Sequence, residues 1–135
     1  MTNVTLIGAG NMGGALAHGW LKSEQVKLTV ADKNEQILQQ FSQQYASVVV
    51  TTDNRQAVKD ADIVVLVVMP WLMDKVLDEI RPELNLDSQI IVSDAANYGT
   101  EKLSSKLGGA GQYFYVIPNI GAEFGASMSF VSYNG

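Results

Sequence analysis

The feature that most restricts how this chain can fold is a regular alternation of short apolar runs with segments whose apolar residues recur at helical spacing. The runs are rich in valine and isoleucine, which is typical of buried strands, and the segments between them are typical of amphipathic helices. Such alternation predicts a parallel sheet with helices on both faces and right-handed crossovers. We therefore expect an α/β fold with a doubly wound, mostly parallel sheet.

The expected elements fill the chain from end to end. The strands are expected at 4–7, 27–32, 47–52, 62–69, 88–94, 112–119 and 127–133, and the helices at 11–22, 35–45, 54–61, 71–80 and 99–109. The fourth run is apolar on both faces, which indicates a central parallel strand. A length of 135 residues without a linker or repeat suits a single domain, residues 1–135.

The first expected strand runs directly into three glycines at the spacing G-x-G-x-x-G. On a strand-to-helix turn, Gly8 would permit the tight turn, Gly10 would let the backbone approach a pyrophosphate, and Gly13 would let the helix pack closely on the strand. The N-terminus of the following helix suits an anion. Asp32 closes the second strand 19 positions after Gly13, about the spacing of a carboxylate that accepts from a ribose hydroxyl. These features predict a Rossmann-type dinucleotide-binding domain; the alternative is a phosphate-free unit with an incidental glycine turn.

In an open α/β sheet, ligands bind outside the carboxyl ends of the strands. The expected strand ends deliver Asp32 to Asn34, Thr51 to Asn54, Val68 to Pro70, Asp94 to Asn97, and Pro118 with Asn119. Simpler interpretations exist for some of these residues. Asp53 or Asn54 would also serve as a helix cap, and Pro70 would also serve to start a helix.

Composition excludes several other functions. A net charge of −5 with no cluster of lysine and arginine argues against nucleic acid, and the absence of cysteine excludes disulfides and thiolate metal sites. The longest apolar run, 63–73, contains Pro70 and is too short to span a bilayer, so we expect a cytoplasmic protein. His18 is interpreted as a surface or packing residue, and Trp20 and Trp71 as packing residues. The acids of "DKVLDEI" are interpreted as a solvated helix face, and no metal-ligand spacing is present.

Several segments together resemble the pyrroline-5-carboxylate reductases. "IGAGNMGGAL" is similar to the opening of that family, and "TTDNRQAVKDADIVVLVVMPWLMDKVLDEI" to the second half of its cofactor site. "IIVSDAANYGTEKL" resembles its Ser-x-Ala-Ala-Gly-Val-Thr segment, and "VIPNIGAEFGAS" its Met-Pro-Asn-Thr-Pro-Ala segment. The deazaflavin-dependent NADP reductases and the 3-hydroxyacid dehydrogenases share parts of this pattern.

The resemblance implies NAD(P)H as cofactor and hydride transfer to the C=N carbon of a five-membered ring, which yields proline. By position it implies cofactor contacts at Gly8, Ala9, Gly10, Asn11, Met12, Gly13, Asp32, Lys33, Asn54, Val67, Val68, Met69, Pro70, Ala95, Ala96 and Asn119. Asp32 favours NADH, because a carboxylate at the strand end would repel the 2′-phosphate of NADPH. No metal is expected, because no metal-ligand spacing is present, and no catalytic side chain is identified.

The departures from the family pattern cluster where nicotinamide and substrate should meet. Met69 stands at the position of the family's lysine, Asn97 at that of a glycine, and Ile120-Gly121 at that of Thr-Pro. The family's C-terminal helical domain, which forms the dimer and holds the substrate, is absent from this chain. We therefore expect the full-length protein to be a homo-oligomer and this fragment alone to be inactive. The alternatives are the cofactor domain of a related reductase with another substrate, and a non-catalytic dinucleotide-binding module.

Overall fold

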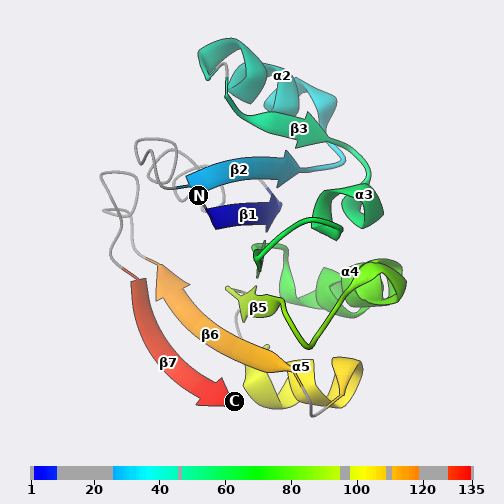
Figure 1. The fold of residues 1–135 in the computed structure, drawn as a ribbon, viewed down its shortest axis with the longest axis vertical. Helices are drawn as coiled ribbons and strands as arrows, with labels where there is room; N and C mark the ends of the chain where they lie inside the picture. The colour runs from blue at the N-terminus through cyan, green and yellow to red at the C-terminus, as the bar shows by residue number, and fades with distance from the viewer. Residues whose placement is uncertain are drawn as a thin grey trace.

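The structure, a computed structural model, describes residues 2–8, 26–45, 47–94, 98–108, 111–118 and 128–134. Its sheet has seven strands in the order β3-β2-β1-β4-β5-β6-β7, which Figure 1 shows from top to bottom. The pairings from β3 through to β6 are parallel, and β7 pairs antiparallel with β6. The predicted doubly wound, mostly parallel α/β sheet of Rossmann type is therefore confirmed.

The strands are β1 (Thr2–Ile7), β2 (Val26–Ala31), β3 (Val49–Thr51), β4 (Ile63–Leu66), β5 (Ile90–Ser93), β6 (Gln112–Pro118) and β7 (Met128–Asn134). The helices are α2 (Glu35–Gln44), α3 (Asn54–Val58), α4 (Met73–Ile80) and α5 (Thr100–Leu107), with short 3₁₀ helices at η1 (Pro70–Leu72) and η2 (Arg81–Glu83). The helix expected at 11–22, with His18 and Trp20, lies outside the described residues.

The two faces of the sheet bury separate apolar layers. Helices α3, α4 and α5 lie along one side of the sheet in Figure 1, over a layer that includes Ile7, Leu66 and Leu77. Helix α2 covers part of the other face, over a layer that includes Leu6 and Phe41. The division follows from the pleat, because successive side chains of a strand point to opposite faces.

The predicted bounds needed correction around β4. Strand β4 ends at Leu66 rather than Met69, although the backbone N–H of Val67 still donates to the carbonyl of Ile7 at 2.9 Å. The helix predicted at 71–80 begins with the 3₁₀ turn η1, and Pro70 opens this turn at a position that requires no N–H donor and suits its fixed φ. This turn leaves Trp71 76% exposed, so the interpretation of Trp71 as a packing residue is wrong.

Candidate functional site

The carboxyl ends of β1, β2 and β4 enclose a cavity of about 330 Å³, which we call the strand-end cavity. Its lining residues are Ile7, Gly8, Ala31, Asp32, Lys33, Asn54, Val67, Val68, Met69, Leu72, Lys75, Val76 and Glu79. Seven of them are predicted site residues, and they come from four separate segments of the chain. They are Gly8, Asp32, Lys33, Asn54, Val67, Val68 and Met69. The fold therefore brings these segments to one place, at the edge where open α/β sheets bind ligands.

Gly8 forms the tight turn that its position after β1 predicted. Its φ is +96°, a conformation that side chains strongly disfavour, and its N–H donates to the carbonyl of Ala31 at 2.9 Å. A Cβ placed on Gly8 would overlap the carbonyl oxygen of Val67 and lie 2.9 Å from the carbonyl carbon. The glycine thus lets the chain leave β1 directly against the end of β4, where no side chain fits.

The structure decides between the two candidate caps of α3. Asp53 is the cap, because its Oδ1 accepts from the backbone N–H of Arg55 at 3.0 Å and of Gln56 at 3.3 Å. Asn54 is the first residue of the helix and is only 4% exposed. Its Nδ2 donates to Oε1 of Glu79 at 2.7 Å.

The other amide atom of Asn54, Oδ1, is buried without a hydrogen-bond partner, and it is the one such side-chain atom in the described part of the chain. Leaving a buried acceptor unpaired costs about 1–3 kcal/mol, so native structures rarely do so without a reason. Since Asn54 lines the strand-end cavity, a donor on a bound molecule would remove this penalty. The cavity therefore holds an acceptor that a ligand can satisfy.

The polar end of the strand-end cavity is a small network of charged side chains. Oε2 of Glu79 lies 3.5 Å from Nζ of Lys33, which also donates to the carbonyl of Thr52 at 3.2 Å. Oδ1 of Asp32 accepts from the backbone N–H of Asn34 at 2.8 Å, which fixes the turn after β2. Two carboxylates and one ammonium group from β2 and α4 thus share this end.

Sequence reasoning missed Glu79. It placed the acids of α4 on a solvated face, but Glu79 is half-buried in the cavity wall and bonded to Asn54. The apolar period identifies the face of α4 that packs on the sheet, through Leu77 and Ile80, but does not reveal that its border closes a cavity. No motif in the sequence signals this residue.

The other end of the strand-end cavity is apolar. Val67, Val68 and Val76 line it, and Met69 and Leu72 stand at its rim with 57% and 40% of their surface exposed. Pro70 is not a lining residue and begins η1 instead. A flat, weakly polar group would find suitable walls here.

Several predicted site residues lie outside the described residues: Ala9, Gly10, Asn11, Met12, Gly13, Ala95, Ala96, Asn97 and Asn119. Asp94, at the end of β5, is described, and its backbone N–H donates to the carbonyl of Leu66 at 2.9 Å. Burial raises the pKa of its carboxyl from 3.8 to about 7. A titratable group thus lies at the same edge of the sheet as the cavity.

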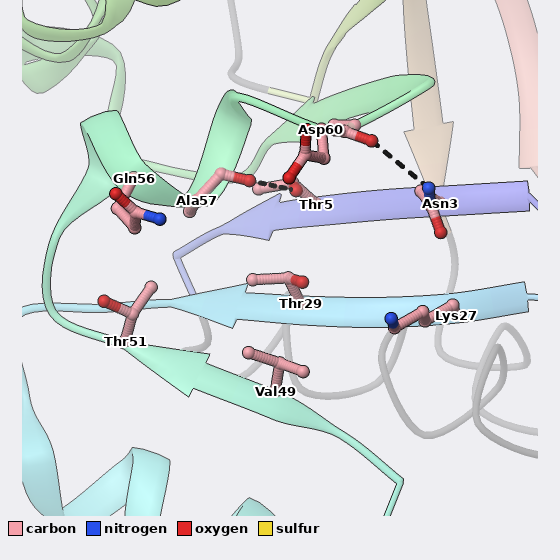
Figure 2. Close-up of a pocket in the computed structure, with 10 residues that line it drawn as sticks. Asn3, Thr5, Lys27, Thr29, Val49, Thr51, Gln56, Ala57 and Asp60 are labelled. Atoms are coloured by element: carbon pink, nitrogen blue, oxygen red, sulfur yellow. Dashed lines mark hydrogen bonds between the residues drawn. The ribbon is translucent and has the colours of Figure 1, made fainter.

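A second hollow, which we call the sheet-face groove, lies over β1, β2 and β3 beside α3 and has a volume of about 240 Å³ (Figure 2). It is lined by Asn3, Thr5, Lys27, Thr29, Val49, Thr51, Gln56, Ala57, Asp60 and Ala61. The hydroxyl of Thr5 donates to the carbonyl of Ala57 at 2.6 Å, and Nδ2 of Asn3 donates to the carbonyl of Asp60 at 3.3 Å. Its buried polar groups are bonded within the protein, so the groove offers a ligand less than the strand-end cavity does.

The described residues contain no cluster of three or more His, Cys, Asp or Glu side chains that would hold a metal ion. Within the same residues, every helix is too short or too polar to cross a membrane.

Comparison with known proteins identifies the family of the chain. Residues 3–97 match the family model described as NADP oxidoreductase coenzyme F420-dependent. Pyrroline-5-carboxylate reductase of Escherichia coli is 33% identical over 138 residues, which covers 97% of this chain and 49% of that protein. The chain thus spans about half the length of the curated relatives it matches.

Solved structures point the same way. A pyrroline-5-carboxylate reductase from Coxiella burnetii superposes with a TM-score of 0.81 at 29% identity, over 87% of this chain and 44% of that one. A pyrroline carboxylate reductase from Plasmodium falciparum with NADP bound superposes with a TM-score of 0.78 at 25% identity, over 98% of this chain and 47% of that one. The resemblance predicted from the sequence is confirmed: the chain belongs to the NADP oxidoreductase coenzyme F420-dependent family and is similar over nearly its whole length to the N-terminal half of pyrroline-5-carboxylate reductases.

Proposed function

We propose that this chain is the NAD(P)H-binding domain of an oxidoreductase that reduces a cyclic imine, as the named pyrroline-5-carboxylate reductases do. The observation that carries the proposal is the strand-end cavity, where Gly8 excludes any side chain and Asn54 presents a buried acceptor without a partner. Both features fit a dinucleotide site, in which the first glycine makes the tight turn after the first strand and the cofactor supplies hydroxyl donors.

Each described residue then has a specific task in binding. Asp32 accepts from a ribose hydroxyl at the end of β2, and Oδ1 of Asn54 accepts from a second donor of the adenosine half. Val67 and Val68 pack against the cofactor with apolar surface. The glycine-rich segment after Gly8 holds the pyrophosphate with its backbone N–H groups.

When bound, NAD(P)H would supply a hydride to the C=N carbon of the ring imine protonated on nitrogen, and the product would be proline. The names of the similar proteins support this choice of reaction. The protein contributes position and a dry site rather than a reacting side chain, because the chemistry belongs to the cofactor.

We assign substrate binding and dimerisation to a part of the protein other than the cofactor domain. We place the substrate and the dimer contact in a helical C-terminal domain, so that the whole protein is a homo-oligomer in the cytoplasm and residues 1–135 bind cofactor without turnover. The exposed apolar side chains of Met69 and Leu72, which line the strand-end cavity, and of the neighbouring Trp71 support this, because a second domain would cover them.

A related reductase with a less polar imine is the second candidate. It is favoured by Met69, which replaces the lysine expected at this turn and lies 57% exposed at the cavity rim beside Trp71. An apolar rim would receive a hydrocarbon ring better than a carboxylate.

Two measurements test the proposal. Isothermal titration of the chain with NADH and with NADPH should show one site for each, and failure of both to bind would contradict dinucleotide binding. The full-length gene product should form proline from pyrroline-5-carboxylate. Turnover of an uncharged cyclic imine without turnover of pyrroline-5-carboxylate would favour the second candidate.

A further inference from the structure

Glu79 connects three segments that are far apart in the sequence. It lies on α4, and its two carboxylate oxygens contact Asn54 at the start of α3 and Lys33 after β2. It also lines the strand-end cavity. No motif assigns this residue a role, yet it contacts two of the polar side chains that line the cavity, Asn54 and Lys33.

The contact with Asn54 determines which way the amide faces. An ionised carboxylate only accepts hydrogen bonds, so the amide must turn its Nδ2 toward Glu79, and the observed distance is 2.7 Å. The amide oxygen then points away from Glu79, where it is buried without a partner. The orientation that leaves Oδ1 available to a ligand is therefore imposed by Glu79.

The contact with Lys33 concerns the charge at the same end of the cavity. Lys33 is the cation next to Asp32, where the 2′ position of an adenosine ribose is expected. Oε2 of Glu79 lies 3.5 Å from its Nζ, and the carbonyl of Thr52 accepts from the same Nζ at 3.2 Å. An ammonium group held in this way is less available to a 2′-phosphate, and the added carboxylate repels that phosphate.

We propose that Glu79 is a positioning residue that sets which dinucleotide the cavity prefers. It holds the amide of Asn54 so that Oδ1 accepts from the cofactor, and it holds Lys33 away from the 2′ position, which favours NAD(H) over NADP(H). The inference rests on the proposed binding of a dinucleotide. Lys75, the other ammonium group of the cavity, lies on α4 and is expected to act on both cofactors alike.

Two substitutions separate the two contacts. In Glu79→Gln the amide oxygen still accepts from Asn54, but the charge is lost, so the Kd for NADPH should fall about fivefold while the Kd for NADH stays within about twofold. In Glu79→Ala the acceptor is lost as well, the Asn54 amide is free to turn, and the Kd for NADH should rise about tenfold. Glu79→Gln should therefore bind NADH much more tightly than Glu79→Ala does. A merely structural role of Glu79 does not predict this difference.

Glu83→Gln is the matched control. Glu83 forms ion pairs with Arg55 at 2.9 Å and Lys59 at 3.8 Å, does not line the strand-end cavity, and loses the same charge on substitution. It should leave the ratio of the two Kd values unchanged. In a Lys33→Met background, the further substitution Glu79→Gln should give no gain in NADPH affinity.

Isothermal titration with NADH and NADPH measures the parent, the four single variants and the double variant, and circular dichroism checks that each is folded. Equal shifts of the ratio in Glu79→Gln and Glu83→Gln would overturn the inference and leave the proposed function intact. So would a gain in NADPH affinity that persists without Lys33, or an alanine variant that binds NADH as the parent does. A parent chain that binds neither dinucleotide would overturn the proposed function and the inference with it.

Discussion

The strand-end cavity and the sheet-face groove lie on the same side of the sheet, and both border α3. They differ in how their polar groups are satisfied. In the groove, the hydroxyl of Thr5 and the amide of Asn3 bond to backbone carbonyls of the α3 region (Figure 2). In the cavity, Oδ1 of Asn54 is buried and has no partner.

The two hollows are similar in size, so the bonding of their polar groups distinguishes them better than their volume does. A hollow whose buried hydroxyl, that of Thr5, is bonded within the protein is a consequence of packing, here of a five-residue α3 that leaves the outer strands partly uncovered. A hollow that retains an unpaired buried acceptor carries a cost in the free protein, and a bound partner recovers it. Binding at the cavity and stability at the groove should therefore respond separately to substitution.

The largest expected effect is at Gly8. Gly8→Ala forces a side chain into a φ of +96° and against the carbonyl group of Val67, so we expect the free energy of unfolding to fall by roughly 3–5 kcal/mol. Urea denaturation measures this change. Dinucleotide affinity should fall too, because the turn at the cavity must shift.

Gly108→Ala is the control for this prediction. Gly108 also has a positive φ, +106°, but a Cβ there meets nothing within 4 Å. It should cost only the backbone strain, about 1–3 kcal/mol, and leave binding unchanged. Equal losses of stability in the two variants would show that the contact with Val67 contributes nothing.

A paired substitution tests the contrast directly. Asn54→Leu removes the unpaired acceptor from the cavity, and we expect dinucleotide affinity to fall by about tenfold to thirtyfold, or roughly 1.4–2 kcal/mol. Thr5→Val removes a bonded hydroxyl from the groove, and we expect a loss of about 1 kcal/mol of stability with unchanged affinity. Titration with NADH and thermal unfolding of both variants provide the readouts. If Thr5→Val weakened binding as much as Asn54→Leu, the assignment of the site to the strand ends would be wrong.

Asp32→Ser tests the cavity at its polar end. A serine keeps an acceptor for the backbone N–H of Asn34 but removes the charge, so the repulsion of a 2′-phosphate is relieved. We expect the ratio of Kd values for NADPH and NADH to fall by about tenfold, or roughly 1.4 kcal/mol. A parent that already prefers NADPH, or a ratio that does not move, would mean that Asp32 does not contact the ribose.

The sequence predicted the fold because several independent signals agreed. The apolar runs, the helical periods and the turn at Gly8 each indicated the same alternation of strands and helices. The convergence of Asp32 and Asn54 on one cavity was also predictable, since the carboxyl ends of parallel strands meet at one edge.

The remaining features depend on contacts that residue types do not encode. Val67 to Met69 are as apolar as the strand before them, so their composition did not reveal that β4 ends at Leu66. Glu79 lies on an amphipathic helix like the other acids of α4, and only the proximity of α3 makes it a partner of Asn54. Whether an acid is solvated or part of a site is decided by tertiary packing, and a helical period contains no information about it.

The smallest expected effect concerns the pH dependence of stability at the strand-end edge. Because burial raises the pKa of Asp94 from 3.8 to about 7, the folded protein retains a proton that the unfolded chain has released between about pH 4 and pH 7. The stability that the protonated carboxyl of Asp94 contributes is therefore fully present below pH 4 and is lost as the pH rises through 7.

The substitution Asp94→Asn keeps the shape of the side chain but removes its titration, so we expect equal stability of parent and variant at pH 4 and a more stable variant at pH 8. The gain should be about 1 kcal/mol, since the carboxyl is only half-buried and solvent screens it. Urea denaturation across this range measures the parent and the variant. Parallel stability profiles for the parent and Asp94→Asn would show that the cost of burying this carboxylate is offset in the folded protein.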